Sequence, residues 1–218
     1  MPDLDARPAT DADIDEVCTT LALGFASDPV WGDWAFPDAR DRVERLTRFW
    51  RPFVSSAVRY EGLMIAPGCS AVAMWVPPGV EEIDPENSAI ADQTIAEVCG
   101  ARAPFVADGF EVFESSRPDG SYWYLSLLAT HPDHRGKGLG MALVAHQLAR
   151  VDAQGLAAYL ESTNPVNIGR YEAAGFALCG AFDLPEGPRV DTMWRPSSDG
   201  SGPAEAADSA RASLPLGR

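Results

Sequence analysis

The sequence is poor in positive charge, and this shortage limits the partners that the protein can have. Its 218 residues include 17 Lys and Arg against 32 Asp and Glu, which gives a formal net charge of −15 at pH 7. Nucleic acids and anionic membranes attract basic surfaces, so this balance argues against both as general partners. A cationic small molecule fits the charge, although acidic proteins are common and the support is weak.

Cysteine pairs and long apolar runs are missing as well. The four cysteines, Cys18, Cys69, Cys99 and Cys179, are widely separated, and no His stands at metal-ligand spacing from them. We therefore expect free buried thiols and no metal site. No apolar run is long enough to span a bilayer, and the first residues lack the basic and apolar regions of a signal peptide. These absences predict a cytoplasmic protein.

Strand and helix patterns alternate along the chain and predict one α/β (α+β) domain with a mixed sheet over residues 1–196. Helices are expected over residues 10–25, 39–60, 141–155 and 165–175, with one or two more between 79 and 120. Strands are expected at 4–7, 62–66, 70–78, 121–130, 156–163, 176–184 and 188–195. Residues 28–37, rich in aromatic and turn residues, are interpreted as a loop. Residues 197–218 are rich in Ser, Ala, Gly, Asp and Pro and are expected to be a disordered tail.

A glycine-rich turn at residues 135–140, Arg-Gly-Lys-Gly-Leu-Gly, follows a strand and opens a helix. Unpaired amides at a helix N-terminus favour anions, and glycine lets a pyrophosphate approach the backbone. Arg135 and Lys137 add positive charge to an otherwise acidic protein. The turn matches neither the P-loop pattern nor the dinucleotide pattern G-x-G-x-x-G. The alternative is a tight turn with no ligand.

Two blocks of the chain resemble motifs of the GNAT acetyltransferase superfamily. Residues 124–140 resemble its acetyl-CoA-binding motif R/Q-x-x-G-x-G/A, matched at Arg135, Gly138 and Gly140, and residues 167–176 resemble its N-x-x-x-Y-E-x-x-G-F element. From about residue 122 onward the chain looks most like the puromycin N-acetyltransferase group. The resemblance implies a GNAT-type mixed, mostly antiparallel central sheet flanked by helices. It also implies transfer of an acetyl group from acetyl-CoA to a primary amine of a small molecule.

The resemblance further implies which residues hold acetyl-CoA. The backbone amides expected at the pyrophosphate are those of Arg135, Gly136, Lys137, Gly138, Leu139, Gly140 and Met141. The strand edge at Leu127, Leu128 and Ala129 is expected to pair with the pantetheine arm, and Asn167 to contact the cofactor. The Tyr171 hydroxyl is expected near the sulfur as the general acid, with a core tyrosine as the alternative.

Acetyl transfer to an amine also needs a base and a stabilised oxyanion. Glu161, on the strand beside the cofactor strand, is the candidate base through water held by Ser162 or Thr163; a carboxylate bonded to neighbouring backbone is an equal alternative. A strand amide near Leu128 or Ala129 is the candidate oxyanion donor. His131 and His134 are interpreted as turn or capping residues.

Aromatic residues are the candidates for the wall of an acceptor pocket, and each is equally well interpreted as a core residue. They are Trp31, Trp34 and Phe36, followed by Trp75 and Tyr124. Asp28 or Asp33 is a candidate to attract a charged amine. Two other functions stay open: acetylation of a protein N-terminus or lysine, and a non-catalytic acyl-CoA sensor, against which Tyr171 and Asn167 both count. A monomer or a homodimer is expected.

Overall fold

The computed structural model of the chain describes residues 5–197, so the tail expected from residue 197 lies, except for Ser197, outside the described residues. The first elements are β1 (Arg7–Pro8), α1 (Ile14–Phe25), α2 (Arg42–Arg59), β2 (Leu63–Ile65), β3 (Ala71–Val76), α3 (Pro85–Cys99) and α4 (Ala103–Ser115). They are followed by β4 (Tyr122–Thr130), α5 (Leu139–Ala153), β5 (Ala157–Ser162), α6 (Ile168–Ala173), β6 (Ala177–Asp183) and β7 (Arg189–Arg195). No helix within residues 5–197 combines the length and the apolar character needed to cross a bilayer.

The strands form one mixed sheet in the order β1-β2-β3-β4-β5-β7-β6. Every neighbouring pair is antiparallel except β4 and β5, which are parallel. A parallel pair needs a crossover connection, and α5 supplies it between these two strands. The expected mixed, mostly antiparallel sheet flanked by helices is confirmed.

The sheet opens between its two central strands. β4 pairs with β5 only from Tyr122 to Leu125, opposite Ala157 to Leu160. Beyond that point β4 stays paired with β3 on its other side as far as Thr130, whereas β5 stays paired with β7. The register with β3 shifts between Met74 and Trp75, and this bulge falls opposite Ser126. Bulges redirect a strand, and here the shift coincides with the divergence of β4 from β5.

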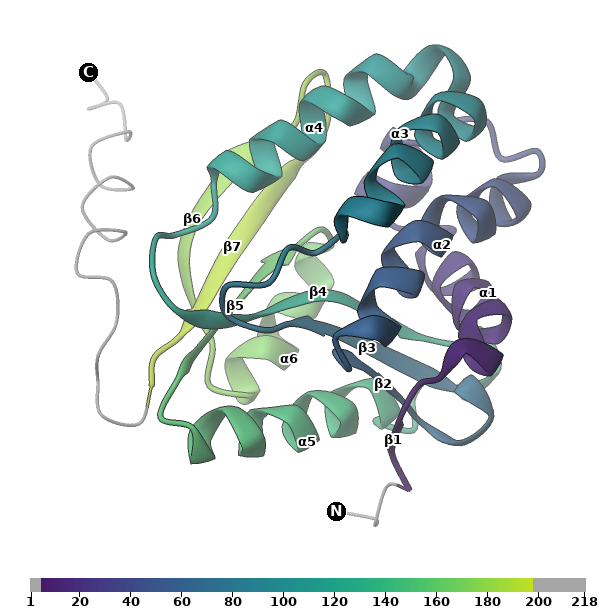
Figure 1. The fold of residues 1–218 in the computed structure, drawn as a ribbon. Coiled ribbons are helices and arrows are strands. Elements are labelled where there is room, and N and C mark those ends of the chain that lie inside the picture. The colour runs from purple at the N-terminus through teal and green to yellow at the C-terminus, as the bar shows by residue number, and fades with distance from the viewer. Residues whose placement is uncertain (1–4, 198–218) are drawn as a thin grey trace, which may run out of the picture.

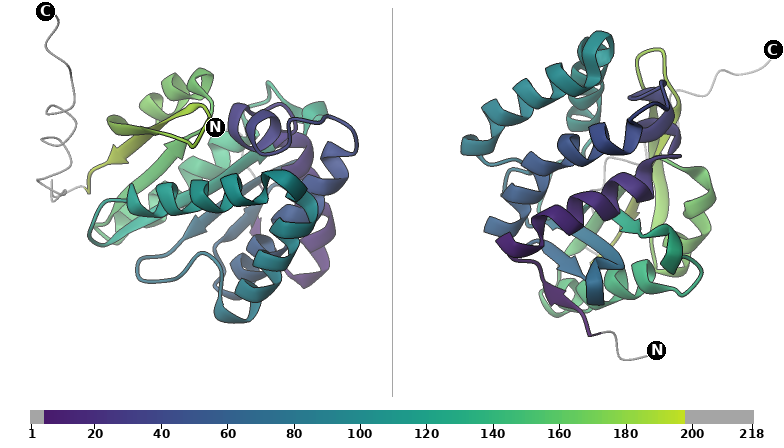
Figure 2. Two further views of the ribbon diagram at one scale, coloured as in Figure 1. Left: turned by 90° about the horizontal axis from the view of Figure 1, so that it is seen from above. Right: turned by 90° about the vertical axis from the view of Figure 1, so that its right-hand side faces the viewer.

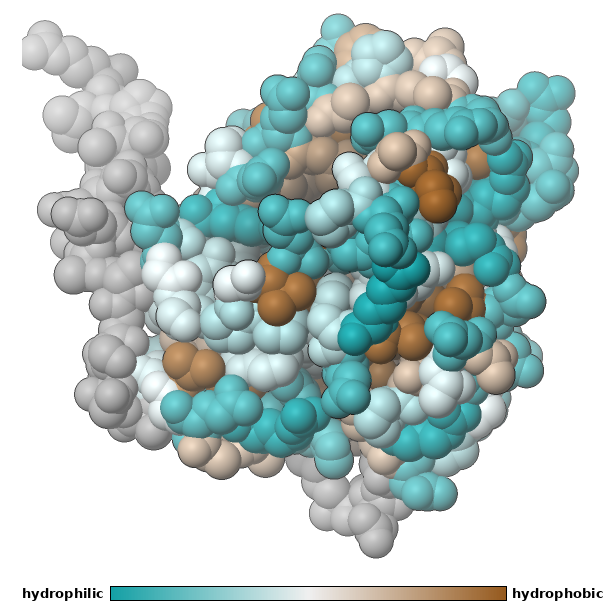
Figure 3. Space-filling view, in the orientation of Figure 1, coloured by the Kyte–Doolittle hydropathy of each residue, from teal (hydrophilic) through white to brown (hydrophobic). Residues whose placement is uncertain are grey.

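Helices cover both faces of the sheet, as Figures 1 and 2 show. One core cluster joins α5 and α6 to one face, through residues such as Leu143, Val144 and Tyr171. The other cluster, which contains most of the buried aromatic rings, joins α1, α2, α3 and α4 to the opposite face. On the face seen in Figure 3 the surface is mainly hydrophilic, and hydrophobic residues lie in small separate groups.

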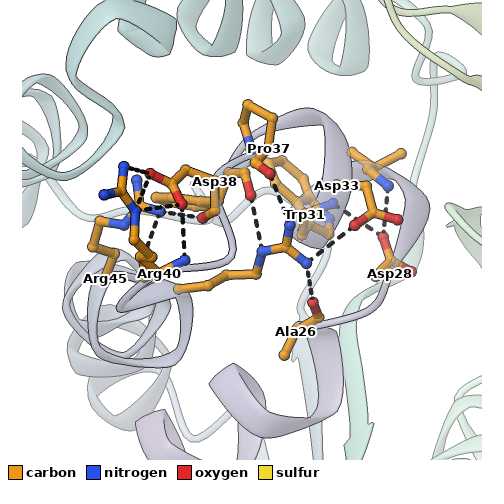
Figure 4. Close-up of polar contacts among 11 residues, drawn as sticks. Ala26, Asp28, Trp31, Asp33, Pro37, Asp38, Arg40 and Arg45 are labelled. Carbon is orange, nitrogen blue, oxygen red and sulfur yellow. Dashed lines mark hydrogen bonds and ion pairs between the residues drawn. The ribbon is translucent and has the colours of Figure 1, made fainter.

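The interpretation of residues 28–37 as a loop is wrong, because Pro29–Trp34 form a short π-helix that is largely buried. Asp28 caps this helix: its Oδ1 accepts hydrogen bonds of 3.0 Å from the amides of both Val30 and Trp31 (Figure 4). Arg42, at the start of α2, donates to the carbonyls of Ala26 and Phe36 at 2.8 and 2.9 Å. Capping and this arginine together fix the segment against the core.

Candidate active site

A cleft of about 610 Å³ lies where β4 and β5 separate. It is lined by Gly24, Phe25, Ser27, Asp28, Leu128, Ala129, Thr130, Arg135, Gly136, Gly138, Leu139, Gly140, Met141, Asn164, Val166, Asn167, Arg170 and Tyr171. The end of α1, the second half of β4, the turn before α5 and the start of α6 therefore meet around one space. Because β5 has left this stretch of β4, the strand edge at Leu128, Ala129 and Thr130 faces the cleft, and no described strand pairs with it on that side.

Glycine is favoured at positions of the turn before α5 either by the backbone conformation or by close packing. Gly136 and Gly138 have φ values of +79° and +75°, a region that side chains disfavour. At Gly140 a Cβ atom would lie 2.9 Å from Thr130 Oγ1, so glycine lets α5 approach β4 closely. The first backbone bond within α5 runs from the Ala142 amide to the Gly138 carbonyl. The amides of Leu139, Gly140 and Met141 precede it, so the helix presents them at the cleft, where an anion is favoured.

The two cations of the turn lie differently. Arg135 lines the cleft and its Nη2 donates to the Gly24 carbonyl at 3.1 Å, which links the turn to the end of α1. Lys137 is not among the lining residues, and its Nζ lies 3.3 Å from His134 Nδ1. His131 Nδ1 accepts from the Asp133 amide at 3.3 Å, which is a capping contact. Of these side chains, only Arg135 is placed to contact a ligand in the cleft.

Tyr171, on α6, borders both the cleft and a smaller cavity of about 40 Å³ behind it. Burial raises the pKa of Tyr171 to about 12, and the negative charge of Asp28 adds to the rise. The phenol is therefore protonated at neutral pH. Among residues 5–197 no hydrogen bond is made by its hydroxyl, so its proton is free for a ligand.

Glu161, on β5, lines the smaller cavity, and only 2% of its side chain is exposed. Burial raises the pKa of Glu161 to about 7, against the opposing effects of Arg117 and of the Tyr124 and Tyr159 hydroxyls. Its Oε1 is buried and has no hydrogen-bond partner in the described part of the chain. A carboxylate in this state can accept a proton near neutral pH. Ser162 and Thr163 line the same cavity.

The aromatic residues expected at an acceptor pocket do not share one place. Trp31 lines the smaller cavity and stacks on Phe113, with ring centroids 5.5 Å apart. Trp34 donates from Nε1 to the Pro185 carbonyl at 3.0 Å and is a core residue, as is the fully buried Phe36. Trp75 belongs to the cluster beneath α5, on the other face of the sheet. Trp34, Phe36 and Trp75 thus lie outside the lining of both cavities.

The remaining predicted residues also separate. Tyr124 packs beside Tyr159 and lines neither cavity. Burial raises the pKa of Tyr124, and the negative charge of Glu161 adds to the rise. Leu127 is buried in the core, so at that position only the backbone is available to a ligand. Asn167 lines both cavities, and its Oδ1 accepts from Arg170 Nη1 at 2.7 Å.

The two acidic candidates near the cleft differ in exposure. Asp28 Oδ2 accepts from Thr163 Oγ1 at 2.8 Å, and burial raises the pKa of Asp28. Its hydrogen bonds hold the π-helix to Thr163, just after β5, beside Tyr171. Asp33 is exposed and pairs with Arg42 at 3.0 Å. Asp28 is therefore the one of the two that borders the site.

Sequence reasoning missed several residues around the two cavities. Asn164 and Arg170 line the cleft, and Ser126 lines the smaller cavity. Arg117 and Glu82 pack behind Glu161. The Asn164-Pro165 pair is a turn signal that points to the first of these. Arg117 and Glu82 come from irregular segments distant in sequence, and no spacing rule links them to Glu161. Within residues 5–197 no group of three or more His, Cys, Asp or Glu side chains is arranged to hold a metal ion.

The cleft fits acetyl-CoA by its chemistry. Three helix amides and Arg135 meet at one end, where a pyrophosphate is stabilised. A strand edge without a neighbour runs along the middle, where an amide-bearing arm adds like a further strand. Tyr171 lies where both cavities meet. The residues present therefore fit a ligand with a pyrophosphate and a long amide-bearing arm.

Comparison with known proteins finds a family match over part of the chain. Residues 87–176, which span α3 to α6, match the model of the acetyltransferase (GNAT) family. A Corynebacterium glutamicum structure described as histone acetyltransferase HPA2 and related acetyltransferase is 25% identical with a TM-score of 0.62, covering 88% of this chain and 96% of that one.

Two more distant structures share the fold. Polyamine N-acetyltransferase of Drosophila melanogaster is 17% identical with a TM-score of 0.52, over 88% of this chain and 99% of that one. Arylalkylamine N-acetyltransferase 2 of Aedes aegypti is 14% identical with a TM-score of 0.55, over 88% and 98%. These two likenesses show a shared fold, and the match to the GNAT family model covers residues 87–176 of this chain.

Proposed function

Starting from a chain with the GNAT fold and a GNAT family match over residues 87–176, we propose that it transfers the acetyl group of acetyl-CoA to a primary amine of a small molecule. One observation carries the proposal: the cleft at the opening of the sheet ends at a buried, protonated tyrosine, behind which lies a carboxylate with a pKa of about 7. An acid and a base with separated pKa values are what acyl transfer to an amine uses.

In this proposal the pyrophosphate lies at the amides of Leu139, Gly140 and Met141, beside Arg135. The pantetheine arm runs along β4 at Leu128 and Ala129. Bound acetyl-CoA supplies an activated thioester carbonyl at the inner end of the cleft. Asn167 and Tyr171, which border both cavities, lie where the thioester meets the acceptor.

The amine nitrogen attacks the thioester carbonyl, so a C–N bond forms and the C–S bond breaks. Glu161 takes the proton that the amine loses, through a water in the smaller cavity. Tyr171 gives its proton to the departing sulfur, so that coenzyme A leaves as the thiol. A β4 amide near Leu128 or Ala129 stabilises the negative charge on the carbonyl oxygen.

The acceptor is proposed to be a small amine rather than a protein. The smaller cavity measures about 40 Å³ and is closed on one side by Trp31. Such a space admits an amine at the end of a slim chain. Two of the structural neighbours are described as polyamine and arylalkylamine N-acetyltransferases, which is in keeping with a small amine. The motifs from about residue 122 onward resemble the puromycin N-acetyltransferase group, but this resemblance does not imply puromycin as the acceptor.

Calorimetric titration with acetyl-CoA followed by a thiol-release screen tests the proposal. The screen includes an aliphatic polyamine, an arylalkylamine, puromycin and a peptide with a free N-terminus. Binding together with thiol release by one of the small amines is expected. Binding without release by any acceptor would favour the acyl-CoA sensor, and release only with the peptide would favour protein acetylation. No binding would overturn the proposal.

A further inference from the structure

A partly buried group of charged and phenolic side chains lies behind Glu161. Arg117, just after α4, donates from Nη2 to Glu82 Oε2 at 2.8 Å. Its Cζ lies 4.2 Å from the centre of the Tyr124 ring. Glu82 Oε1 accepts a hydrogen bond from Ser126, the residue at the bulge of β4. Three segments distant in sequence therefore place one cation beside two carboxylates.

Arg117 lies closer to the carboxylate of Glu82 than to that of Glu161. It is hydrogen-bonded to Glu82, whereas its Nε lies 3.7 Å from Glu161 Oε1. Within the described residues neither Arg117 Nε nor Glu161 Oε1 has a hydrogen-bond partner, although both atoms are buried. A buried ion pair normally closes to hydrogen-bond distance, because unpaired buried polar atoms are costly. The gap leaves Glu161 Oε1 without a hydrogen bond from the guanidinium, and Glu161 lines the smaller cavity.

We propose that Arg117 is a positioning residue for acetyl transfer: Glu82 holds its guanidinium back from Glu161, so that Arg117 favours the ionised form of Glu161 without bonding the oxygen that takes the proton of the acceptor amine. This inference rests on the proposed function for the part that concerns catalysis. The arrangement of charges in the free protein does not depend on it.

The sign of each effect follows from the groups that face Glu161. They are Arg117 after α4, Glu82 before α3, Tyr122 and Tyr124 on β4, Tyr159 on β5 and Cys179 on β6. Arg117 is the cation among them, so its removal disfavours the ionised form of Glu161. Removal of Glu82 takes away a like charge and frees Arg117 to bond Glu161 directly, so it favours the ionised form. The two variants break the same ion pair with opposite consequences.

The experiment follows the carboxyl carbon-13 signal of Glu161 in the free, full-length protein as a function of pH, with the signal assigned by its loss in Glu161→Gln. We expect the titration midpoint to rise by about one pH unit or more in Arg117→Gln and to fall in Glu82→Gln. In Arg117→Lys, which keeps the charge, the midpoint stays near that of the natural protein.

Arg102→Gln is the matched control for the loss of an arginine. Arg102 is partly buried at the other end of α4, lies 4.4 Å over the Phe105 ring and also has an unbonded buried Nε. Its loss should leave the Glu161 midpoint unchanged. Midpoints that do not move, or that move in the same direction in Arg117→Gln and Glu82→Gln, would overturn the proposal.

The pH dependence of kcat/KM for the amine found in the screen separates this inference from the proposed function. We expect its acid limb to follow the Glu161 midpoint in each variant, with acetyl-CoA affinity unchanged. Midpoints that move as expected while the limb stays fixed would confirm the charge arrangement and overturn Arg117 as a positioning residue for transfer. If the natural protein is inactive with every amine, Arg117 is overturned as a positioning residue for transfer, and so is the proposed function.

Discussion

Tyr171 unites burial, a free hydroxyl and a position shared by both cavities. In Tyr171→Phe the ring that packs against Phe176 is kept and only the hydroxyl is lost. We expect kcat to fall by roughly 100-fold, because general acid catalysis contributes at least that much, while the calorimetric Kd for acetyl-CoA stays the same.

Tyr122→Phe is the matched control for Tyr171→Phe. The Tyr122 ring packs against Tyr159 and Trp194 and lines neither cavity. Well above the Glu161 midpoint, where that carboxyl is ionised in both proteins, its kcat should equal that of the natural protein. An unchanged kcat in Tyr171→Phe would remove Tyr171 as the acid and leave it as a wall of the cleft.

The two titratable groups of the site set the pH range of activity. Glu161 must be ionised and its pKa is raised to about 7 by burial, so kcat/KM should increase as pH rises through about 7. Tyr171 must be protonated and its pKa is raised to about 12, so no fall is expected below about pH 10. Initial rates measured from about pH 5.5 to about pH 10 check this. The range begins about 1.5 pH units below the pKa of Glu161. A rate that decreases from neutral pH upward would contradict both assignments.

At the scale of elements, the N-terminal end of α5 lines the cleft and its C-terminal end does not. Gly138 and Gly155 flank it with φ values of +75° and +65°, and an added Cβ meets no atom within 4 Å at either position. Alanine at each should cost about 1 kcal/mol of unfolding free energy through the left-handed backbone. Only Gly138→Ala should also weaken acetyl-CoA binding, because it alters the amides that face the cleft. Chemical denaturation and calorimetry measure the two effects, and equal Kd values in both variants would move the pyrophosphate elsewhere.

Elements with a clear period were predictable from the sequence. The stripe Ile14, Val17, Leu21 and Phe25 predicted the correct end of α1. The Gly-rich turn predicted a helix from residue 141, and α5 begins slightly earlier, at Leu139. The segment 28–37 was missed because proline, glycine and aspartate usually mark loops. Here Asp28 caps a short π-helix and buried tryptophans anchor it, which is a tertiary effect.

The candidate site was predictable only where it is local in sequence. The turn at 135–140 and Tyr171 lie within motifs, so their neighbourhood in the cleft could be expected. Arg117 and Glu82 meet Glu161 only because α4 and the segment before α3 pack over the same end of the sheet. Trp75 was a candidate both for the acceptor wall and for the core, and the alternation of β3 places it in the core beneath α5. Periodicity shows that two faces exist, and it does not show which face an isolated aromatic takes.

At the scale of the whole molecule, the two halves of the sheet are joined by the short pairing of β4 with β5. A ligand that fills the opening binds the folded chain and not the unfolded one. At 100 times its Kd, acetyl-CoA should therefore stabilise the fold by about 2.7 kcal/mol. For a chain of this size the melting temperature should rise by roughly 5 to 10 °C.

The location of this stabilisation is a stricter test than its size. If the pantetheine arm adds to the edge of β4, hydrogen exchange should slow at amides of residues 126–130 and at Leu139, Gly140 and Met141. Amides on the outer edge of β6, which no described strand covers, serve as the internal control and should exchange as before. Slowing that is uniform along the chain would mean that acetyl-CoA stabilises the fold from some other place. Slowing at β4 without slowing at α5 would keep the arm in the cleft and remove the pyrophosphate from the helix terminus.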